Sequence, residues 1–338
     1  MSKATINHVA QRAGVSIKTV SRVVNNEPNV SPATREKVLK AVEELAYQPN
    51  PSARSLAGKR TFVLGLLYDN PSANYVIDVQ NGALAASRAQ GYDLLIHPCD
   101  HRSPTLIQEV AELLDQSRVD GLILTPPLSD LSAVLERLIA SKLPFVRIAP
   151  AVDKHLSPYV ATNDRDAAYQ MTLQLLTLGH KRIGFICGHP DHQAVAGRYQ
   201  GYCAALGEHG IEVQEKYVVQ GYNSFESGEQ AARKLLALTP RPTAIFAAND
   251  DMAAGTMMVA HQLGLNIPND ISVAGFDDTP VAHQIWPSLT TVRQPIQTMA
   301  QTAAELLLTQ VRGKKLPSAD TELESSLIVR DSTGPVLG

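Results

Sequence analysis

The chain has 338 residues, of which 44% are hydrophobic, 19% charged and 5% aromatic, and its formal net charge is −3. This composition is typical of a soluble globular protein with room for two or three compact units. Every apolar run is broken by glycine, proline or a charge well before about 18 residues, which excludes a membrane span.

Charge is divided unevenly along the chain. Residues 1–60 contain ten Lys or Arg and four Asp or Glu, so this segment carries +6 and the remainder −9. A basic segment joined to an acidic body indicates that the basic part meets a polyanion such as nucleic acid. The charge alone does not establish nucleic-acid binding, because many solvated helices are basic.

The compartment that the sequence favours is the cytoplasm. The first 14 residues, MSKATINHVAQRAG, hold no apolar segment of the kind that a secretory signal needs. The three cysteines, Cys99, Cys187 and Cys203, form no CxxC pair and have no metal-ligand spacing around them. We therefore expect free thiols in a reducing compartment, with no bound metal or cofactor.

The first predicted elements are two short helices joined by a tight turn. Thr5 is a good N-cap for the first helix, Gly14 ends it, and Ser16 caps the second. The segment from Ala10 to Val20 has the spacing typical of a helix-turn-helix. It contains a small residue (Ala10), a glycine (Gly14) and two aliphatic residues (Val15 and Val20). Residues 31–32, Ser-Pro, begin a third helix. The alternative is a generic three-helix domain that contacts proteins.

The second helix presents a short, polar and cationic face that suits the major groove of DNA. Arg22 can pair with a guanine edge, Lys18 can reach a base or a phosphate, and Ile17 can pack on a thymine methyl group. Further candidates for phosphate and register contacts are Thr5, Ser16, Thr19, Ser21 and Asn25.

A helix too short to hold together alone in water is predicted within residues 49–60. Asn50 is its N-cap and Gly58 its stop signal. Ala53 is small enough for two copies to pack closely, which leaves Leu56 as an apolar wedge among cations. Such a wedge fits a base step in the minor groove. A plain inter-domain linker is the alternative, because it has the same composition.

The pieces AGVS, TVSRVVN, VSPATREKV and YQPNPSARSLAG follow one another in register between residues 13 and 58. This run closely resembles the LacI/GalR family of repressors, and the resemblance continues along nearly the whole chain. It implies a hinge helix that folds on the operator and inserts Leu56 at the central base step. We expect a homodimer paired chiefly through residues 74–90, because the chain ends without the heptads that would form a tetramer.

From residue 61 onward the chain alternates apolar strand-like runs, such as TFVLGLLYD, with amphipathic helices. This order predicts an α/β body with parallel sheets covered on both faces. The resemblance implies the two-lobed type I periplasmic-binding-protein fold, with a ligand cleft between the lobes. The predicted domains are 1–48 (helix-turn-helix), 49–60 (hinge) and 61–338 (effector binding), with an N-lobe of about 61–161 and 292–322 and a C-lobe of about 162–291 and 323–338.

Ligands of open parallel sheets bind beyond the C-terminal ends of the strands, so polar residues in the loops there are the candidates. They are Asp69, Asn74, Tyr75, Arg147, His192, Arg198, Asn223, Asn249 and Asp277. The resemblance implies that Arg198 clamps the effector and that Asn249 and Asp277 are its polar partners. Asn223 departs from the family, in which an aromatic residue is often found there.

Several of these residues have simpler interpretations. Arg198 can form a structural ion pair, His192 can be an ordinary loop histidine, and Asp250 and Asp251 can merely cap a helix. Trp286, the only tryptophan, can stack on a sugar ring, but we expect it to pack beneath the neighbouring loop.

The predicted effector is a sugar or a sugar derivative. The vicinal hydroxyls of a sugar need paired hydrogen-bond donors and acceptors, which the candidate residues supply. A purine or another polar metabolite has similar needs. The family resemblance favours a sugar. The chain has no GxSxG, GxxxxGK[ST] or HExxH motif, so no catalytic residue is predicted.

We therefore predict a repressor of carbohydrate-utilisation genes that a sugar-like inducer releases from a palindromic operator. One alternative is a corepressor-dependent regulator that responds to a non-sugar metabolite. Another, of a different class, is a cytoplasmic sugar-binding protein or enzyme with no role at DNA.

Overall fold

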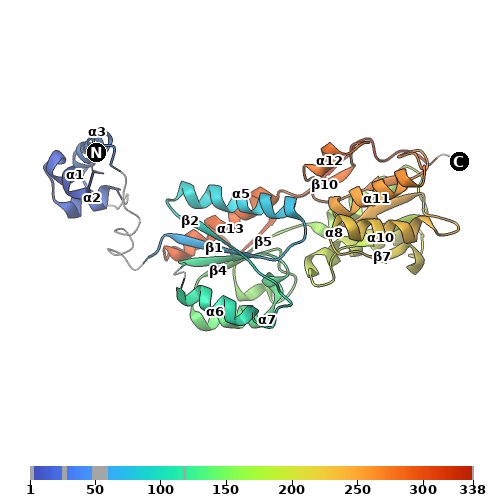
Figure 1. Cartoon of the computed structure of the whole chain (residues 1–338), viewed down its shortest axis with the longest axis horizontal. Coiled ribbons are helices and arrows are strands. Elements are labelled where there is room, and N and C mark those ends of the chain that lie inside the picture. Colours follow the sequence, from blue (N-terminus) through green and yellow to red (C-terminus); the bar gives the residue numbers. More distant parts are fainter. Residues whose placement is uncertain (1–3, 25–28, 48–59, 117–118, 337–338) are drawn as a thin grey trace. The chain divides into compact units, whose positions relative to one another are not determined.

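The computed structural model describes residues 4–24, 29–47, 60–116 and 119–336 (Figure 1). The chain divides into two compact units, Met1–Phe62 and Val63–Gly338, which we call the head and the body. Among the described helices, none combines the length and the apolar character that crossing a membrane requires. Asn25, Asn50, Ala53 and Leu56, for which DNA contacts are predicted, lie outside the described residues.

Three helices make up the described part of the head: α1 (Ile6–Ala13), α2 (Ile17–Val24) and α3 (Pro32–Glu44). Gly14 ends α1 in the left-handed region at φ +66°, which lets Val15 N donate to Ala10 O at 3.1 Å. Ser16 then caps α2, because its Oγ accepts from Thr19 N at 3.1 Å. The sequence prediction of a helix–turn–helix is confirmed.

The head has its own small core beneath the three helices. The buried side chains that fill it are Val9, Ala10, Val20, Val23, Val38 and Ala41. At the surface, Arg12 of α1 pairs with Glu44 of α3 at 2.7 Å. With Val20 and Val23 turned inward, the opposite side of α2 is left at the surface.

The first sheet of the body has six described strands in the order β11-β5-β4-β3-β1-β2, all parallel. The strands are β1 (Val63–Tyr68), β2 (Asp93–Pro98), β3 (Gly121–Leu124), β4 (Phe145–Ile148), β5 (Tyr159–Thr162) and β11 (Asp320–Leu323). The helices are α5 (Ala73–Ala89), α6 (Leu106–Gln116), α7 (Ser132–Ser141) and α13 (Ile296–Val311). Helices α5 and α13 pack together, and Figure 1 shows α6 and α7 across the sheet from α5. This layer set is the N-lobe.

The second sheet has the order β7-β6-β8-β9 and is also parallel throughout. Its strands are β6 (Ile183–Cys187), β7 (Val218–Gln220), β8 (Ala244–Ala247) and β9 (Ser272–Ala274). The helices are α8 (Asp164–Thr177), α9 (Ala196–Glu208), α10 (Phe225–Leu236), α11 (Asp250–Gln262) and the short α12 (Val281–Gln284). Helix α8 packs on α9 and α10 on α11, and we call this layer set the C-lobe.

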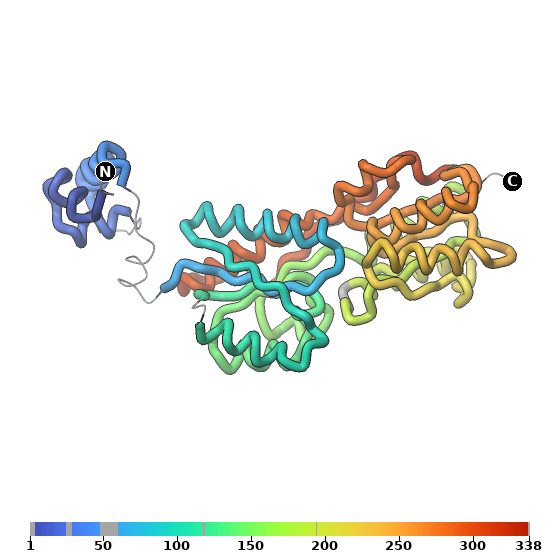
Figure 2. Tube along the Cα trace, viewed as in Figure 1, coloured from blue at the N-terminus to red at the C-terminus, as the bar shows by residue number. Residues whose placement is uncertain are grey.

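The described chain between residues 119 and 336 passes between the two lobes three times. The passages lie between β5 and α8, between β10 (Thr291–Arg293) and α13, and between β11 and β12 (Ser326–Ile328). Strands β10 and β12 pair antiparallel beside the C-lobe. Figure 2 traces these passages at the boundary of the lobes. The predicted α/β body with parallel sheets is confirmed.

Trp286 does not pack beneath a loop, and that expectation is wrong. Its side chain is 81% exposed, while Ala282 and Leu289 are fully buried and fill the space below this segment. The backbone carbonyl of Trp286 accepts from His261 Nε2 at 3.1 Å.

Two glycines of α9 provide a matched test of the packing between α8 and α9. A Cβ at Gly201 would lie 2.1 Å from the backbone oxygen of Arg165, whereas a Cβ at Gly207 would meet nothing within 4 Å. We expect Gly201→Ala to lower the free energy of unfolding by about 1–3 kcal/mol. Gly207→Ala should raise it by about 0.5–1 kcal/mol. Thermal unfolding of both variants checks this, and equal shifts in Tm would contradict it.

Candidate functional site

A small polar cavity of about 40 Å³ lies between the lobes. It is formed where β1, β3, β6 and β8 end, on the carboxyl edges of both sheets and at the points where the strand order reverses. Its lining residues are Asn70, Ser72, Tyr75, Pro126, Ala149, Asp164, His192, Val195, Arg198, Asn223, Asn249, Asp277 and Gln294. We call it the inner cavity.

Arg198 is the one cation among the residues that line the inner cavity, and it is held on every side. Its Nε donates to Asp164 Oδ2 at 3.1 Å, and its Nη1 lies 3.6 Å from Asp277 Oδ1. Nη1 also donates to the carbonyl of Ala248, and the guanidinium lies 3.9 Å from the centre of the Phe276 ring. The charge of Arg198 is therefore balanced by two carboxylates within the protein.

Asp277 is buried and takes an unusual backbone conformation at φ +121°. Its own N–H donates to Val292 O at 2.8 Å, and its Oδ1 accepts from Gln294 Nε2 at 2.6 Å. Burial raises the pKa of Asp277 to about 7, against the opposing effect of Arg198. A non-glycine residue held at such a φ is typical of a functional site.

A polar ring joins two of the passages between the lobes. Thr162 Oγ1 lies 2.5 Å from Asp164 Oδ1 and 3.2 Å from Gln294 Oε1. Asp164 pairs with Arg198, Arg198 lies beside Asp277, and Gln294 bonds Asp277. The contacts therefore form a ring that runs Thr162–Asp164–Arg198–Asp277–Gln294 and back to Thr162. A ligand that touches any member therefore acts directly on the segments that connect the lobes.

Asn223 and Asn249 shape the C-lobe side of the cavity. Asn249 Oδ1 accepts from Met252 N at 3.0 Å and caps α11, while its Nδ2 donates to Asn223 O at 3.0 Å. Asn223 Oδ1 accepts from His189 N at 3.1 Å and so holds the loop 188–195. His192 on that loop is buried, which lowers its pKa to about 4 and keeps its imidazole neutral.

Tyr75 supplies an N-lobe wall of the cavity. Burial raises the pKa of its phenol, which is therefore a neutral hydrogen-bond donor at every physiological pH. Asn74 does not line the cavity. Its side chain and that of Ser72 bond Asp251 of α11, and these bonds oppose the rise in the pKa of Asp251 that burial causes.

Arg147 also lies away from the cavity, although an effector contact is predicted for it. Its side chain is fully buried within the N-lobe. Its donors reach Ser157 Oγ at 3.0 Å and the backbone oxygens of Ser129, Val152 and Asp153 at 3.1, 3.0 and 2.6 Å. These hydrogen bonds hold the loop after β4 in place, so they favour a structural role for Arg147.

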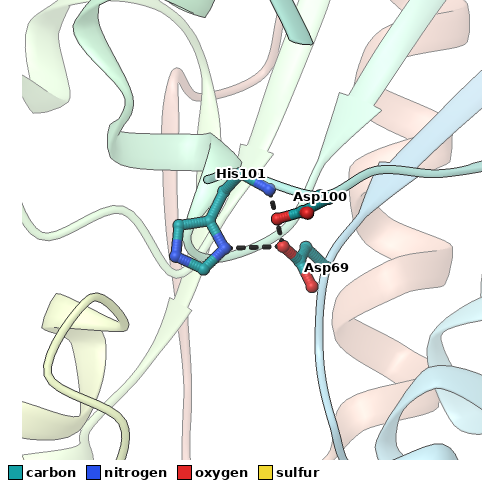
Figure 3. A group of neighbouring side chains, drawn as sticks. All are labelled: Asp69, Asp100 and His101. Atoms are coloured by element: carbon teal, nitrogen blue, oxygen red, sulfur yellow. Dashed lines mark hydrogen bonds and ion pairs between the residues drawn. The ribbon is translucent and has the colours of Figure 1, made fainter. Parts of the chain in front are cut away.

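Asp69 belongs to a charged cluster whose N-lobe members Asp69, Asp100 and His101 are drawn in Figure 3 and which reaches the C-lobe through Asp191. Its Oδ2 accepts from His101 N at 2.8 Å and lies 2.6 Å from His101 Nδ1, while His101 Nε2 lies 2.9 Å from Asp191 Oδ2 of the C-lobe. Arg102 Nη2 donates to the same Asp191 oxygen at 2.9 Å and lies 3.1 Å from His189 Nε2. We call this cluster the latch.

The latch is a set of ion pairs centred on His101, which lies between Asp69 and Asp191. Asp69, Asp100 and His101 lie close enough together to ligate a metal. Both ring nitrogens of His101 face carboxylates, however, and this favours the doubly protonated ring, which has no lone pair to offer a metal. Asp100 Oδ1 accepts from Arg102 N at 2.9 Å.

The sequence prediction omitted several residues that the structure brings to the cleft. Gln294 comes directly after β10 and Asp164 comes two residues after the end of β5, so the rule that selects loops after strands contains a signal for both. His101, Arg102 and Asp191 lie in loops that come together only in the folded body, and their pairing has no local signal.

The exposed side of α2 is the candidate DNA-binding surface of the head. Lys18 and Arg22 are exposed, and Ile17 is 51% exposed. Ser16 Oγ and Thr19 Oγ1 lie 2.9 Å apart at the start of the helix. Thr5 is exposed before α1, and Ser21 is half-buried on α2.

Comparison with known proteins agrees with this division into head and body. Residues 5–50 match the model of bacterial regulatory proteins of the lacI family, and residues 172–333 match that of periplasmic binding protein-like domains. Catabolite control protein A of Priestia megaterium is 34% identical over 330 residues, which cover 97% of this chain and 99% of that protein.

Two solved structures are similar over nearly the full length. The transcriptional regulator CelR in complex with cellobiose has a TM-score of 0.76 and 32% identity, covering 97% of this chain and 99% of that one. The lac repressor dimer bound to operator and the anti-inducer ONPF has a TM-score of 0.79 and 30% identity, covering 98% and 100%. The chain belongs to the LacI family of bacterial regulatory proteins. It is a DNA-binding transcriptional regulator whose body has the type I periplasmic-binding-protein fold.

The latch should make the stability of the body depend on pH. Burial alone would lower the pKa of His101, but its hydrogen bonds to Asp191 and Asp69 outweigh burial and raise it. The stabilisation is therefore complete below the ordinary histidine pKa of about 6.5 and is lost as the pH rises through the raised value.

We expect His101→Gln to lower Tm at about pH 6 and to have a smaller effect at about pH 9. Thermal unfolding of both proteins at the two pH values measures this difference. His155→Gln, at an exposed histidine, is the control. A loss in Tm that is equal at both pH values would show that His101 is not charged in the latch.

Proposed function

We propose that the protein represses carbohydrate-utilisation genes and that a neutral, sugar-like inducer, bound in the cleft between the lobes with hydroxyls in the inner cavity, releases it from a palindromic operator. The observation that supports this most is the balanced charge of Arg198 between Asp164 and Asp277. An anionic effector would have to compete with two buried carboxylates for one guanidinium. A polyhydroxylated neutral ligand instead meets both donors and acceptors.

The polar composition of the inner cavity supports a sugar further. Amides of Asn70 and Gln294, the phenol of Tyr75 and the neutral imidazole of His192 each can donate or accept a hydrogen bond. Sugar recognition depends on such groups, because each buried hydroxyl without a partner costs about 1–3 kcal/mol. The similarity to a regulator solved with cellobiose agrees with this class of effector.

The proposed mechanism couples the inner cavity to DNA through the arrangement of the lobes. A ligand that binds one arrangement better by a few kcal/mol shifts the population toward it. The polar ring and the latch are the contacts that differ between a closed and an open cleft. We propose that effector binding lowers operator affinity, so that the effector is an inducer. A corepressor that tightens operator binding is the second candidate.

DNA recognition is assigned to the exposed side of α2. Arg22 and Lys18 are the proposed base or phosphate contacts and Ile17 the proposed thymine contact. Two heads on a palindromic site require a homodimer. The similarity to the lac repressor dimer supports this state, and so do the apolar side chains of Ile77 on α5 and Trp286, which are 53% and 81% exposed. The proposal places the protein in the cytoplasm and gives it no catalytic step.

Removal of Arg22 should weaken operator binding more than removal of another exposed cation on the head. We expect Arg22→Ala to lower the affinity for the cognate duplex about 5- to 150-fold, because a bidentate contact to guanine contributes about 1–3 kcal/mol of discrimination. Lys40→Ala removes the same charge from the exposed surface of α3. Fluorescence anisotropy with a duplex selected from a random pool measures both. Equal losses would mean that Arg22 contributes charge alone.

Titration of small molecules into the complex of full-length protein and duplex tests whether the effector lowers or raises operator affinity. It also tests the chemical class of the effector. We expect at least one mono- or disaccharide to weaken operator affinity about tenfold or more, as a ligand with differential affinity must. Adenine and hypoxanthine form the second arm of the titration. Tighter operator binding with any of these compounds would reverse the sign, and a response to the purines alone would replace the sugar.

A further inference from the structure

A second and larger cavity of about 660 Å³ lies against the inner cavity, and we call it the outer groove. The two share Ala149, Asp164, His192 and Val195 in their walls. Pockets that hold small-molecule ligands measure about 300–1,000 Å³, so the outer groove has the size of a ligand site and the inner cavity of about 40 Å³ does not by itself.

The lining of the outer groove suits sugar hydroxyls. Gln193 and Gln200 contribute amides that offer donors and an acceptor. The amides of Asn163 and Gln220 are partly engaged within the protein, because Asn163 Oδ1 accepts from Ser325 N at 2.8 Å and Gln220 Nε2 donates to Gly188 O and Gly221 O at 2.5 and 2.6 Å. Tyr199 contributes an aromatic ring that packs 5.6 Å from Phe185 and is thereby held in place. A fixed ring provides a surface for the apolar face of a pyranose.

The charged side chains of the outer groove are largely paired. Lys154 and Arg165 face the cleft with Asp166, Glu322 and the shared Asp164, and Arg165 Nη1 lies 3.7 Å from Asp166 Oδ1. Because Asp164 is paired with Arg198, the two cations and the other two carboxylates of the described lining offset one another. This lining therefore suits a neutral ligand better than an anion.

The boundary between the cavities is made by side chains that serve both. Asp164 directs Oδ2 to Arg198 in the inner cavity and Oδ1 to Thr162, which lines the outer groove. His192 lines both cavities and is neutral at physiological pH. A ligand that extends past these two residues would contact both cavities at once.

We propose that the outer groove is a subsite for a second pyranose ring, so that the preferred inducer is a neutral disaccharide. One ring binds where the two cavities meet, with hydroxyls directed toward Arg198, Asp277 and Gln294, and the other binds among the amides and Tyr199. This inference rests on the proposed function, because it names the class of sugar that the same effector site selects.

Calorimetric titration of the full-length protein tests the subsite. The probes are glucose and galactose, together with cellobiose, maltose, lactose and melibiose, which contain them. We expect one disaccharide to bind at least about tenfold more tightly than either monosaccharide. Gln200→Trp places an indole in the groove at an exposed position of α9. It should weaken the disaccharide about tenfold and leave monosaccharide affinity within about twofold.

Gln301→Ala, at an exposed glutamine of α13 that bonds only Glu305 among the described residues, is the matched control. It should bind both sizes of sugar as the parent protein does. Equal affinity for mono- and disaccharides, or a disaccharide affinity that Gln200→Trp leaves unchanged, overturns the subsite and leaves the proposed function standing. Binding of no sugar of either size overturns the proposed function itself, and the subsite with it.

Discussion

The buried ion pairs of Arg198 are the contacts on which the rest of the body depends. Asp164 begins α8 directly after one passage between the lobes, and Gln294, which bonds Asp277, lies on another. The guanidinium therefore connects two hinge segments to the C-lobe helix that carries it. Because a buried charge left without its partner costs about 3–5 kcal/mol, these bonds hold the start of α8 and the segment around Asp277 firmly against α9.

This arrangement explains how a small molecule bound in the body can act on the head. The inner cavity lies at the hinge segments, so ligand contacts alter the ring, and the latch lies at the outer edge of the same cleft. The ring and the latch thus hold the cleft at two separate places, one buried and one partly exposed. A shift of only a few kcal/mol between lobe arrangements suffices to change operator affinity by a large factor. The buried ring holds the hinge segments together, and the partly exposed latch joins the lobes with a smaller, pH-dependent contribution.

Much of the fold could be predicted from sequence because local patterns specify it. Gly14 and Ser16 fix the turn of the head by backbone chemistry, and apolar runs between helices predict parallel sheets. The site was predictable only in part. Arg198, Asn249 and Asp277 lie C-terminal to strands and line the cavity, but Arg147 lies near the end of β4 itself and is turned inward to bond carbonyl groups. Whether an arginine faces a cleft or its own lobe depends on tertiary packing, and so does the pairing of His101 with Asp191.

The central claim is that the polar ring transmits ligand binding to the head, and thermodynamic coupling measures this most directly. The affinity of the inducing sugar is determined with and without saturating operator duplex, for the parent protein and for Thr162→Val. The threonine hydroxyl bonds Asp164 and faces Gln294, and Thr162 lines the outer groove but not the inner cavity, so the sugar used is a monosaccharide. We predict a coupling of about tenfold or more in the parent protein that falls toward one in Thr162→Val, with sugar affinity of the free protein within about threefold. An undiminished coupling in Thr162→Val would contradict the account.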